Sequence, residues 1–158
     1  STGWNVRAID LAGEMLRLAE VNVRAAGLSA RISLEQVDSK KLPYESGSFD
    51  AVMSNSIVHH IPEPARVFAE MFRVVKPGGL LFVRDLLRPD DRETLEELVQ
   101  TYAGDENAHQ RQMFRDSLGA ALTVVEVRDL ISELGISPDD VRQTTDRHWT
   151  LATWLRVK

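Results

Sequence analysis

Short apolar runs alternate along this chain with longer segments in which apolar residues recur every three or four positions. The short runs predict β-strands over residues 6–9, 32–37, 49–53 and 80–83. The periodic segments predict amphipathic helices between and after these strands. The helix that starts near Pro62 and Pro64 has a predicted buried stripe of Phe68, Met71, Phe72 and Val75. This alternation is typical of an α/β fold with a layered sheet.

Local sequence signals mark the ends of two predicted helices and a hairpin at the C-terminus. Gly27 stands where a left-handed residue would end the first helix, and Thr123 with Glu126 forms a capping box that starts a later one. Residues 141–145 and 149–157 are strand-like and only three residues apart, which predicts an antiparallel hairpin. We therefore expect one domain over residues 1–158, with a three-layer, doubly wound, mostly parallel sheet and this C-terminal antiparallel hairpin.

The composition narrows the class of protein. The sequence has no cysteine, which excludes disulfides, thiolate metal sites and cysteine nucleophiles. Its net charge is −5, so it offers no global positive field to a nucleic acid. No apolar run reaches the roughly 18 residues that a membrane-spanning helix needs. We expect a cytoplasmic protein that binds neither a nucleic acid nor a membrane.

Polar residues stand directly after the predicted strands. Ligands of a doubly wound sheet bind outside the carboxyl ends of its strands, so these positions are candidates for a binding site. They are Asp10, Asp38, Ser54, Asn55 and Asp85. A nucleoside could lie across carboxylates gathered along one edge of such a sheet.

Five short segments occur in a fixed order around these strand ends. They are residues 6–11 (VRAIDL), 37–38 with 42–43 (VD and LP), 48–52 (SFDAV), 59–62 (HHIP) and 75–79 (VKPGG). Each alone is a weak signal, but the ordered set resembles the class I S-adenosylmethionine-dependent methyltransferases over nearly the whole chain. The resemblance implies a Rossmann-like fold and S-adenosyl-L-methionine as the cofactor.

The resemblance also implies roles on the cofactor side of the site. Asp10 would accept hydrogen bonds from the two ribose hydroxyls, which suits a carboxylate because it has two oxygens. Leu11 would pack on the adenine ring, and Asp38, with Ser39 beside it, would accept from the adenine amino group. The structural alternatives are a carboxylate held by the dipole of the next helix for Asp10, a core leucine for Leu11 and a loop aspartate for Asp38.

The resemblance implies that the segment at the end of the family's fourth strand lies near the methionine part of the cofactor and near the substrate. Ser54 and Asn55 would line the methionine part, chiefly through their backbone. His59 and His60 would lie on the substrate side, where one could act as a general base if the acceptor must lose a proton. The alternative is packing at a helix entry with a solvent-facing imidazole. Neighbouring residues do not share a helix face and no third ligand is close in sequence, so we expect no metal site.

The sequence departs from the family at its start. The family's first strand leads into a glycine-rich turn, G-x-G-x-G, whereas no two of the nine glycines here are separated by a single residue. That first family strand is therefore absent from this sequence, and we interpret the chain as N-terminally truncated. The alternatives are self-association through the incomplete sheet and direct pairing of the strands that flank the missing one.

The predicted activity is S-adenosylmethionine-dependent methyl transfer to an unidentified small-molecule acceptor at oxygen, nitrogen or carbon. No catalytic residue follows from the sequence, because the sulfonium already activates the methyl group and the protein mainly aligns the reactants. Residues 104–122 could cover the acceptor or form a solvated surface helix.

Two other classes of function compete with this prediction. A catalytically incomplete methyltransferase-like domain that works by binding or association is favoured by the missing glycine turn. A nicotinamide dehydrogenase also places an acidic residue after its second strand. Its Tyr-x-x-x-Lys pair is absent, because Ser48 follows Tyr44 and Glu106 follows Tyr102 at that spacing.

Overall fold

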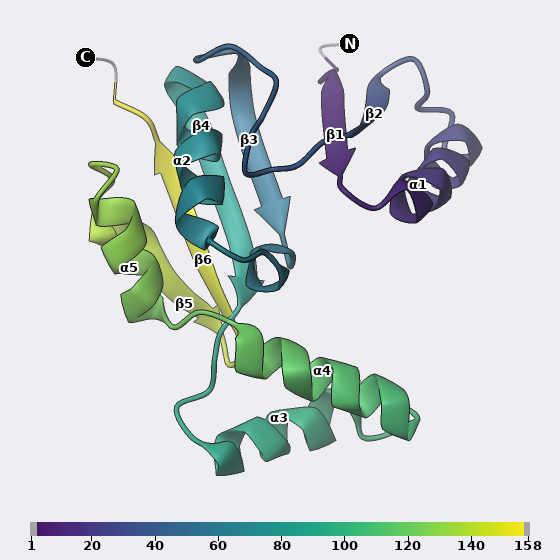
Figure 1. Ribbon diagram of the computed structural model, residues 1–158, viewed down its shortest axis with the longest axis vertical. Helices are drawn as coiled ribbons and strands as arrows, with labels where there is room; N and C mark the ends of the chain where they lie inside the picture. The colour runs from purple at the N-terminus through teal and green to yellow at the C-terminus, as the bar shows by residue number, and fades with distance from the viewer. Residues whose placement is uncertain (1–2, 157–158) are drawn as a thin grey trace. The chain divides into compact units, whose positions relative to one another are not determined.

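The computed structural model describes residues 3–156, which form two compact units that meet in sequence between Tyr44 and Glu45 (Figure 1). The first unit contains a two-stranded sheet and the second a four-stranded sheet. The expectation that residues 1–158 form one domain stays a prediction.

The first unit is a β–α–β motif. Its strands β1 (Val6–Asp10) and β2 (Ile32–Gln36) pair in parallel, with α1 (Gly13–Ala25) as the crossover between them. The ladder keeps one register from the first to the last residue of both strands. The carboxyl ends of β1 and β2 therefore lie at the same edge of this small sheet.

Helix α1 is well terminated but weakly buried. Gly27 adopts the left-handed conformation (φ 68°), and Leu28 N donates to the Val23 carbonyl at 3.0 Å, so the predicted glycine cap is confirmed. No residue of α1 is fully buried, and Met15 and Leu18 are exposed. The first unit thus has only a thin apolar core.

The second unit is built on a mixed sheet with the strand order β3-β4-β6-β5. Its strands are β3 (Phe49–Asn55), β4 (Val75–Leu86), β5 (Val141–Thr145) and β6 (His148–Trp154). β3 and β4 are parallel, whereas β4–β6 and β5–β6 are antiparallel, so the predicted C-terminal hairpin is confirmed. His148 belongs to β6 rather than to the turn, and residue 157 of the predicted strand lies outside the described residues.

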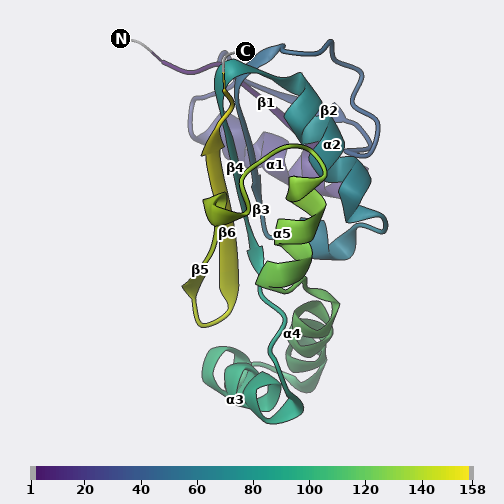
Figure 2. The same cartoon turned by 90° about the vertical axis from the view of Figure 1, so that its left-hand side faces the viewer.

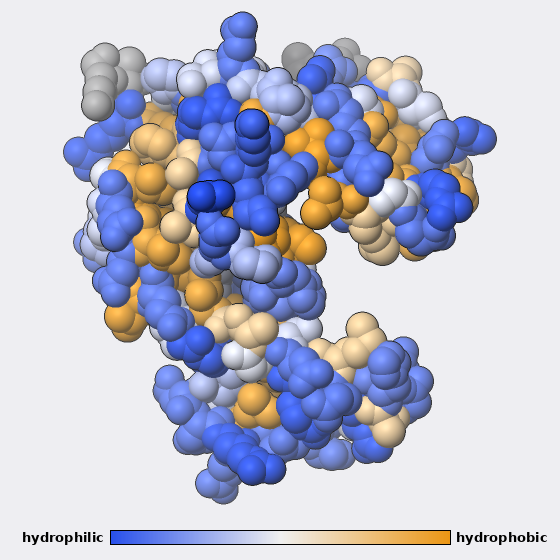
Figure 3. Space-filling view, viewed as in Figure 1, coloured by the Kyte–Doolittle hydropathy of each residue, from blue (hydrophilic) through white to orange (hydrophobic). Residues whose placement is uncertain are grey.

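Helices α2 (Pro64–Val74) and α5 (Val124–Ser132) cover one face of this sheet (Figures 1 and 2). The core between them combines fully buried side chains of both helices and the sheet, among them Phe68, Ile131, Val83, Trp149 and Leu151. Figure 3 shows polar side chains over the outward side of α2 and apolar ones gathered beside it, toward α5. Trp149 is 1% exposed, which places it in the core.

The opposite face of the four-stranded sheet carries exposed apolar side chains. Met53 of β3 is 71% exposed and Trp154 of β6 is 69% exposed. The predicted α/β class, with parallel pairing and a C-terminal antiparallel hairpin, is confirmed. Among the described residues of this unit, however, no helical layer covers the second face, because the two remaining helices pack on each other.

These helices are α3 (Arg92–Ala103) and α4 (Ala108–Ala120), which form a separate helical hairpin beyond the sheet (Figure 1). Their own small core consists of Leu86, Leu98, Val99, Leu118 and Ala121. Arg115 donates two hydrogen bonds of 2.8 Å to the Glu96 carboxylate, which joins α4 to α3. Tyr102 Oη donates to Asp146 Oδ2 at 2.6 Å and ties α3 to the turn between β5 and β6.

The junction between α2 and β4 differs from the sequence prediction. α2 ends at Val74, so Val75 starts β4 instead of closing the helical stripe. The strand therefore begins before residue 80, where the apolar run had placed its start. Pro77 explains the difference, because it has no N–H to continue a helix and disfavours helical backbone at the residue before it. Gly79 follows in a crowded position, where an added Cβ would lie 2.8 Å from the Asp50 carbonyl oxygen.

The predicted capping box is present at the start of α5. Glu126 N donates to Thr123 Oγ1 at 3.2 Å, and Thr123 N donates to Glu126 Oε2 at 2.8 Å. Thr123→Ala should lower the free energy of unfolding by about 1 kcal/mol, because it leaves a helix N–H group without its acceptor. Urea denaturation followed by circular dichroism measures this. Thr123→Ser is the matched control: it keeps the hydroxyl, so an equal loss in both variants would contradict the prediction.

Candidate functional site

The first candidate group lies at the carboxyl edge of the β1–β2 pair. Asp10 ends β1, and its Oδ1 accepts a hydrogen bond from Ala12 N at 2.7 Å. Asp38 follows β2, and its Oδ1 accepts from Lys40 N at 2.9 Å. Val37 N donates to the Asp10 carbonyl oxygen at 3.1 Å, which joins the two strand ends. The structure therefore brings Asp10 and Asp38 to one edge of the first unit.

Each of these carboxylates keeps an oxygen that can accept further hydrogen bonds. Within the described residues, Asp10 Oδ2 has no hydrogen-bond partner, and Asp38 Oδ2 lies 3.9 Å from Lys40 Nζ. Leu11 is 64% exposed, so it is not a core leucine, while Ser39 is half-buried beside Asp38. The hydrogen bond from Ala12 N to Asp10 Oδ1 holds the chain just before α1, which begins at Gly13.

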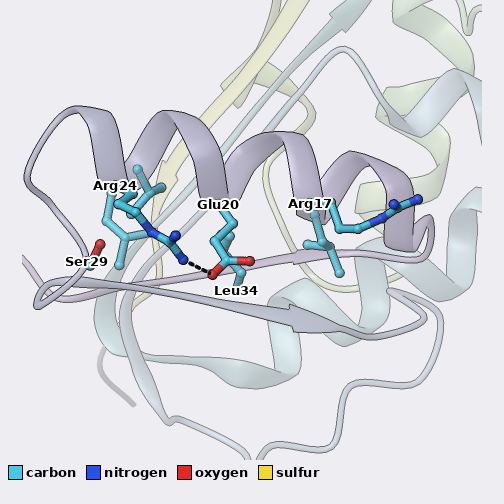
Figure 4. Close-up of a pocket in the computed structure, with 8 residues that line it drawn as sticks. Arg17, Glu20, Arg24, Ser29 and Leu34 are labelled. Atoms are coloured by element: carbon cyan, nitrogen blue, oxygen red, sulfur yellow. Dashed lines mark hydrogen bonds and ion pairs between the residues drawn. The ribbon is translucent and has the colours of Figure 1, made fainter.

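A hollow between α1 and β2 is a separate feature of the first unit (Figure 4). Its apolar lining consists of Leu16, Val23, Ile32 and Leu34. Arg24 Nη2 pairs with Glu20 Oε1 at 2.7 Å beside it. No predicted site residue lines the hollow, so we interpret it as the seam between helix and sheet.

In the second unit, the carboxyl end of β3 leads into a sharp turn. Ser54 Oγ is buried and has no hydrogen-bond partner within residues 3–156, whereas Asn55 is exposed. Ser56 adopts a left-handed backbone conformation (φ 53°), and its N–H donates to the Arg84 carbonyl at 2.9 Å. The turn directs the chain into the short 3₁₀ helix η1 (Val58–His60), which carries both predicted histidines.

The two histidines have different environments. His59 Nδ1 lies 2.5 Å from Asp85 Oδ1, and the His59 side chain is only 4% exposed. His60 is exposed, and its ring lies against the His59 ring with 3.9 Å between the centroids. The His59 ring is therefore fixed by Asp85, whereas His60 fits the alternative of a solvent-facing imidazole.

Asp85 in β4 is the residue that organises this turn. Its side chain is 1% exposed, and it is the sole buried charged residue in the part of the chain that the structure describes. Oδ2 accepts hydrogen bonds from Ile57 N at 2.9 Å and Val58 N at 2.6 Å. Oδ1 accepts from Leu86 N at 2.7 Å as well as from His59. Four donors thus converge on one carboxylate.

The pKa values of Asp85 and His60 follow from this arrangement. Burial raises the pKa of Asp85, but the hydrogen bond and the charge interaction with His59, followed by the hydrogen bonds from Leu86 N and Val58 N, together lower it more, so it lies below its ordinary value. Asp85 is therefore ionised at neutral pH. Partial burial and the neighbouring His59 lower the pKa of His60, which favours a neutral ring.

The sequence placed Asp85 at the end of a predicted strand but indicated no role for it. An acidic residue directly after an apolar strand was the available signal, and the two histidines downstream of β3 supplied the potential donors. The pairing across 26 residues could not be derived from spacing, because it depends on which face of β4 Asp85 occupies.

His148 is a further polar group at this end of the four-stranded sheet. Its Nδ1 lies 2.8 Å from Thr145 Oγ1 and 3.3 Å from Arg84 Nη2. Burial, with Arg84 and Arg147 nearby, lowers the pKa of His148. Among residues 3–156, no group of three or more histidine or carboxylate side chains is placed to hold a metal ion. Nor does any helix in this range have the length and apolar character to cross a membrane.

Comparison with known sequences gives a family. Residues 1–83 match the methyltransferase domain family. An uncharacterized protein of Haemophilus influenzae is 30% identical over 149 residues, which cover 85% of this chain and 59% of that protein. The 27-O-demethylrifamycin SV methyltransferase of Amycolatopsis mediterranei is 29% identical over 151 residues, covering 93% of this chain and 52% of the enzyme. The chain thus spans about half the length of these curated relatives.

Solved structures agree with the family on the fold. A SAM dependent methyltransferase from Aquifex aeolicus matches with a TM-score of 0.66 at 19% identity, over 94% of this chain and 67% of that one. An O-methyltransferase family protein from Burkholderia thailandensis matches with a TM-score of 0.68 at 18% identity, over 96% and 44%. Since the family match extends over residues 1–83 of 158 and the fold is shared, the chain belongs to the class I S-adenosylmethionine-dependent methyltransferase family.

Proposed function

We propose that this chain binds S-adenosyl-L-methionine and serves methyl transfer to a small-molecule acceptor at oxygen, nitrogen or carbon. The observation that carries the proposal is the pair of carboxylates at one edge of the parallel β1–β2 sheet, in a member of this family. Asp10 and Asp38 each keep an oxygen for a ligand there. Two such acceptors suit a nucleoside, which offers ribose hydroxyls and an adenine amino group as donors.

On the cofactor side, we assign the ribose hydroxyls to Asp10 and the adenine amino group to Asp38. Leu11 is exposed, as a side chain that packs on an adenine ring must be in the free protein. Ser39 stands beside Asp38 in this assignment. Ser54 and Asn55 would line the methionine part of the cofactor. The bound cofactor supplies an electrophilic methyl group, so the protein has to hold and orient rather than activate.

On the acceptor side, we assign His59 as the group that takes a proton from an acceptor that must lose one. Its Nδ1 is held by Asp85, which leaves Nε2 as the basic atom. Relatives named as a ubiquinone biosynthesis O-methyltransferase and a norajmaline N-methyltransferase differ in the acceptor atom. These names support a small-molecule acceptor as a class and do not select one.

A catalytically incomplete domain that works by binding or association is the second candidate. Within the described residues, β1 pairs only with β2 and β3 pairs only with β4, so each is an edge strand of its sheet. An open strand edge is a surface on which another strand can add.

Asp10→Asn should weaken the binding of S-adenosylhomocysteine at least about 10-fold, because it removes the charge that strengthens hydrogen bonds from the ribose hydroxyls. Isothermal titration calorimetry measures the dissociation constant. The matched control is Glu20→Gln on α1, where a surface carboxylate paired with Arg24 is neutralised, and its affinity should match the wild type. Equal binding by wild type and Asp10→Asn would refute the role of Asp10, and no binding by the wild type would favour the second candidate.

His59→Asn should slow methyl transfer to a phenol on the order of 100-fold while leaving the affinity for S-adenosylhomocysteine unchanged. The Asn amide can still donate to Asp85, so the turn keeps its anchor while the basic nitrogen is lost. The measurement uses S-adenosylmethionine with a labelled methyl group and a panel of phenols and secondary amines. His60→Asn is the parallel variant: if it alone abolishes transfer, His60 and not His59 is the base.

A further inference from the structure

We propose that Asp85 is a positioning residue that holds His59 with its proton on Nδ1 and its lone pair on Nε2. The inference rests on the proposed function, because it names what prepares the acceptor-side base. It concerns contacts within the second unit only.

The ionised Asp85 carboxylate can accept hydrogen bonds but cannot donate one. His59 Nδ1 lies 2.5 Å from Asp85 Oδ1, so this nitrogen must carry the hydrogen. A neutral imidazole has one hydrogen, which leaves Nε2 as an acceptor. Within residues 3–156, no hydrogen-bond partner for Nε2 is present, so the lone pair of this atom is not used by the protein.

The same carboxylate also fixes where the ring lies. Asp85 Oδ2 binds the backbone N–H groups of Ile57 and Val58, which are the two residues directly before His59. Ser56 N donates to the Arg84 carbonyl, which fastens the preceding residue to the same strand. The backbone before His59 and the His59 ring are therefore both anchored to the end of β4. A shift of β4 would move the imidazole with it.

Asp85→Asn should reverse the tautomer. Ile57 N and Val58 N can only donate hydrogen bonds, so the amide oxygen of the new side chain is favoured at the position of Oδ2. The NH₂ group then faces His59, which can adapt by moving its hydrogen to Nε2 and accepting at Nδ1. The NH₂ group also meets Leu86 N, a donor, so the variant should be less stable than the wild type.

The test is ¹⁵N NMR of the imidazole nitrogens at mildly alkaline pH. The protein has four histidines, and the spectrum of His59→Asn identifies the His59 signals by their loss. The wild type should show His59 protonated on Nδ1, and Asp85→Asn should show it protonated on Nε2. Asp50→Asn is the matched control, because Asp50 is an exposed carboxylate paired with Lys76, and the His59 tautomer should be unchanged in it.

A wild-type His59 that carries its proton on Nε2 would overturn the inference, as would an Asp85→Asn variant that keeps the wild-type tautomer. The wild-type spectrum decides the first point even if Asp85→Asn fails to fold. With any phenol that the wild type methylates, Asp85→Asn should lower kcat about 10- to 100-fold with an unchanged KM for S-adenosylmethionine. A purely structural role would not reverse the tautomer.

These readouts separate the inference from the proposed function. Failure of the wild type to bind S-adenosylhomocysteine would refute the proposed function, while the tautomer measurement would still stand. Binding of S-adenosylhomocysteine together with the wrong tautomer would refute the role of Asp85 and leave cofactor binding intact.

Discussion

The burial of the Asp85 charge is the constraint on which the second unit depends. A carboxylate removed from water loses several kcal/mol of solvation, which only hydrogen bonds or an opposite charge can restore. Asp85 obtains four donors, and three of them are backbone N–H groups of Ile57, Val58 and Leu86. The fourth is His59. The turn after β3 therefore has to adopt the one path that delivers its N–H groups to this carboxylate, including the left-handed Ser56.

The position of Asp85 in the sheet makes this constraint effective. β4 lies between β3 and β6, and Asp85 is opposite Trp149 in the β4–β6 ladder. Trp149 is fully buried and its ring packs against Phe68 of α2 at a centroid distance of 6.3 Å. The carboxylate thus lies beside the apolar core cluster that contains Trp149 and Phe68. A polar site held by such a core can keep its geometry without a ligand.

The sequence predicted those features that depend on local chemistry. The Gly27 cap, the Thr123–Glu126 capping box and the C-terminal hairpin each follow from neighbouring residues, and the structure contains all three. It predicted less well what depends on tertiary contacts. The Asp85–His59 pair requires two segments to meet beside β4. Within the described residues of the second unit, Met53 is exposed and α3 and α4 pack on each other, which the amphipathic pattern of these helices does not reveal. The start of β4 at Val75 was predicted too late in the chain, although Pro77 was a local signal that the helix ends before it.

The two groups of proposed site residues lie in units that differ in their internal support. The proposed acceptor-side residue His59 belongs to a unit with a buried core, in which the Asp85 carboxylate accepts four hydrogen bonds. The proposed cofactor-side residues Asp10 and Asp38 belong to a unit in which helix α1 has no fully buried residue and leaves Met15 and Leu18 exposed. Elements with few buried contacts open locally at low free energy. A ligand that binds only the ordered form stabilises it by an amount that grows with the logarithm of its concentration relative to its dissociation constant, so cofactor binding and the ordering of the first unit should be one coupled equilibrium.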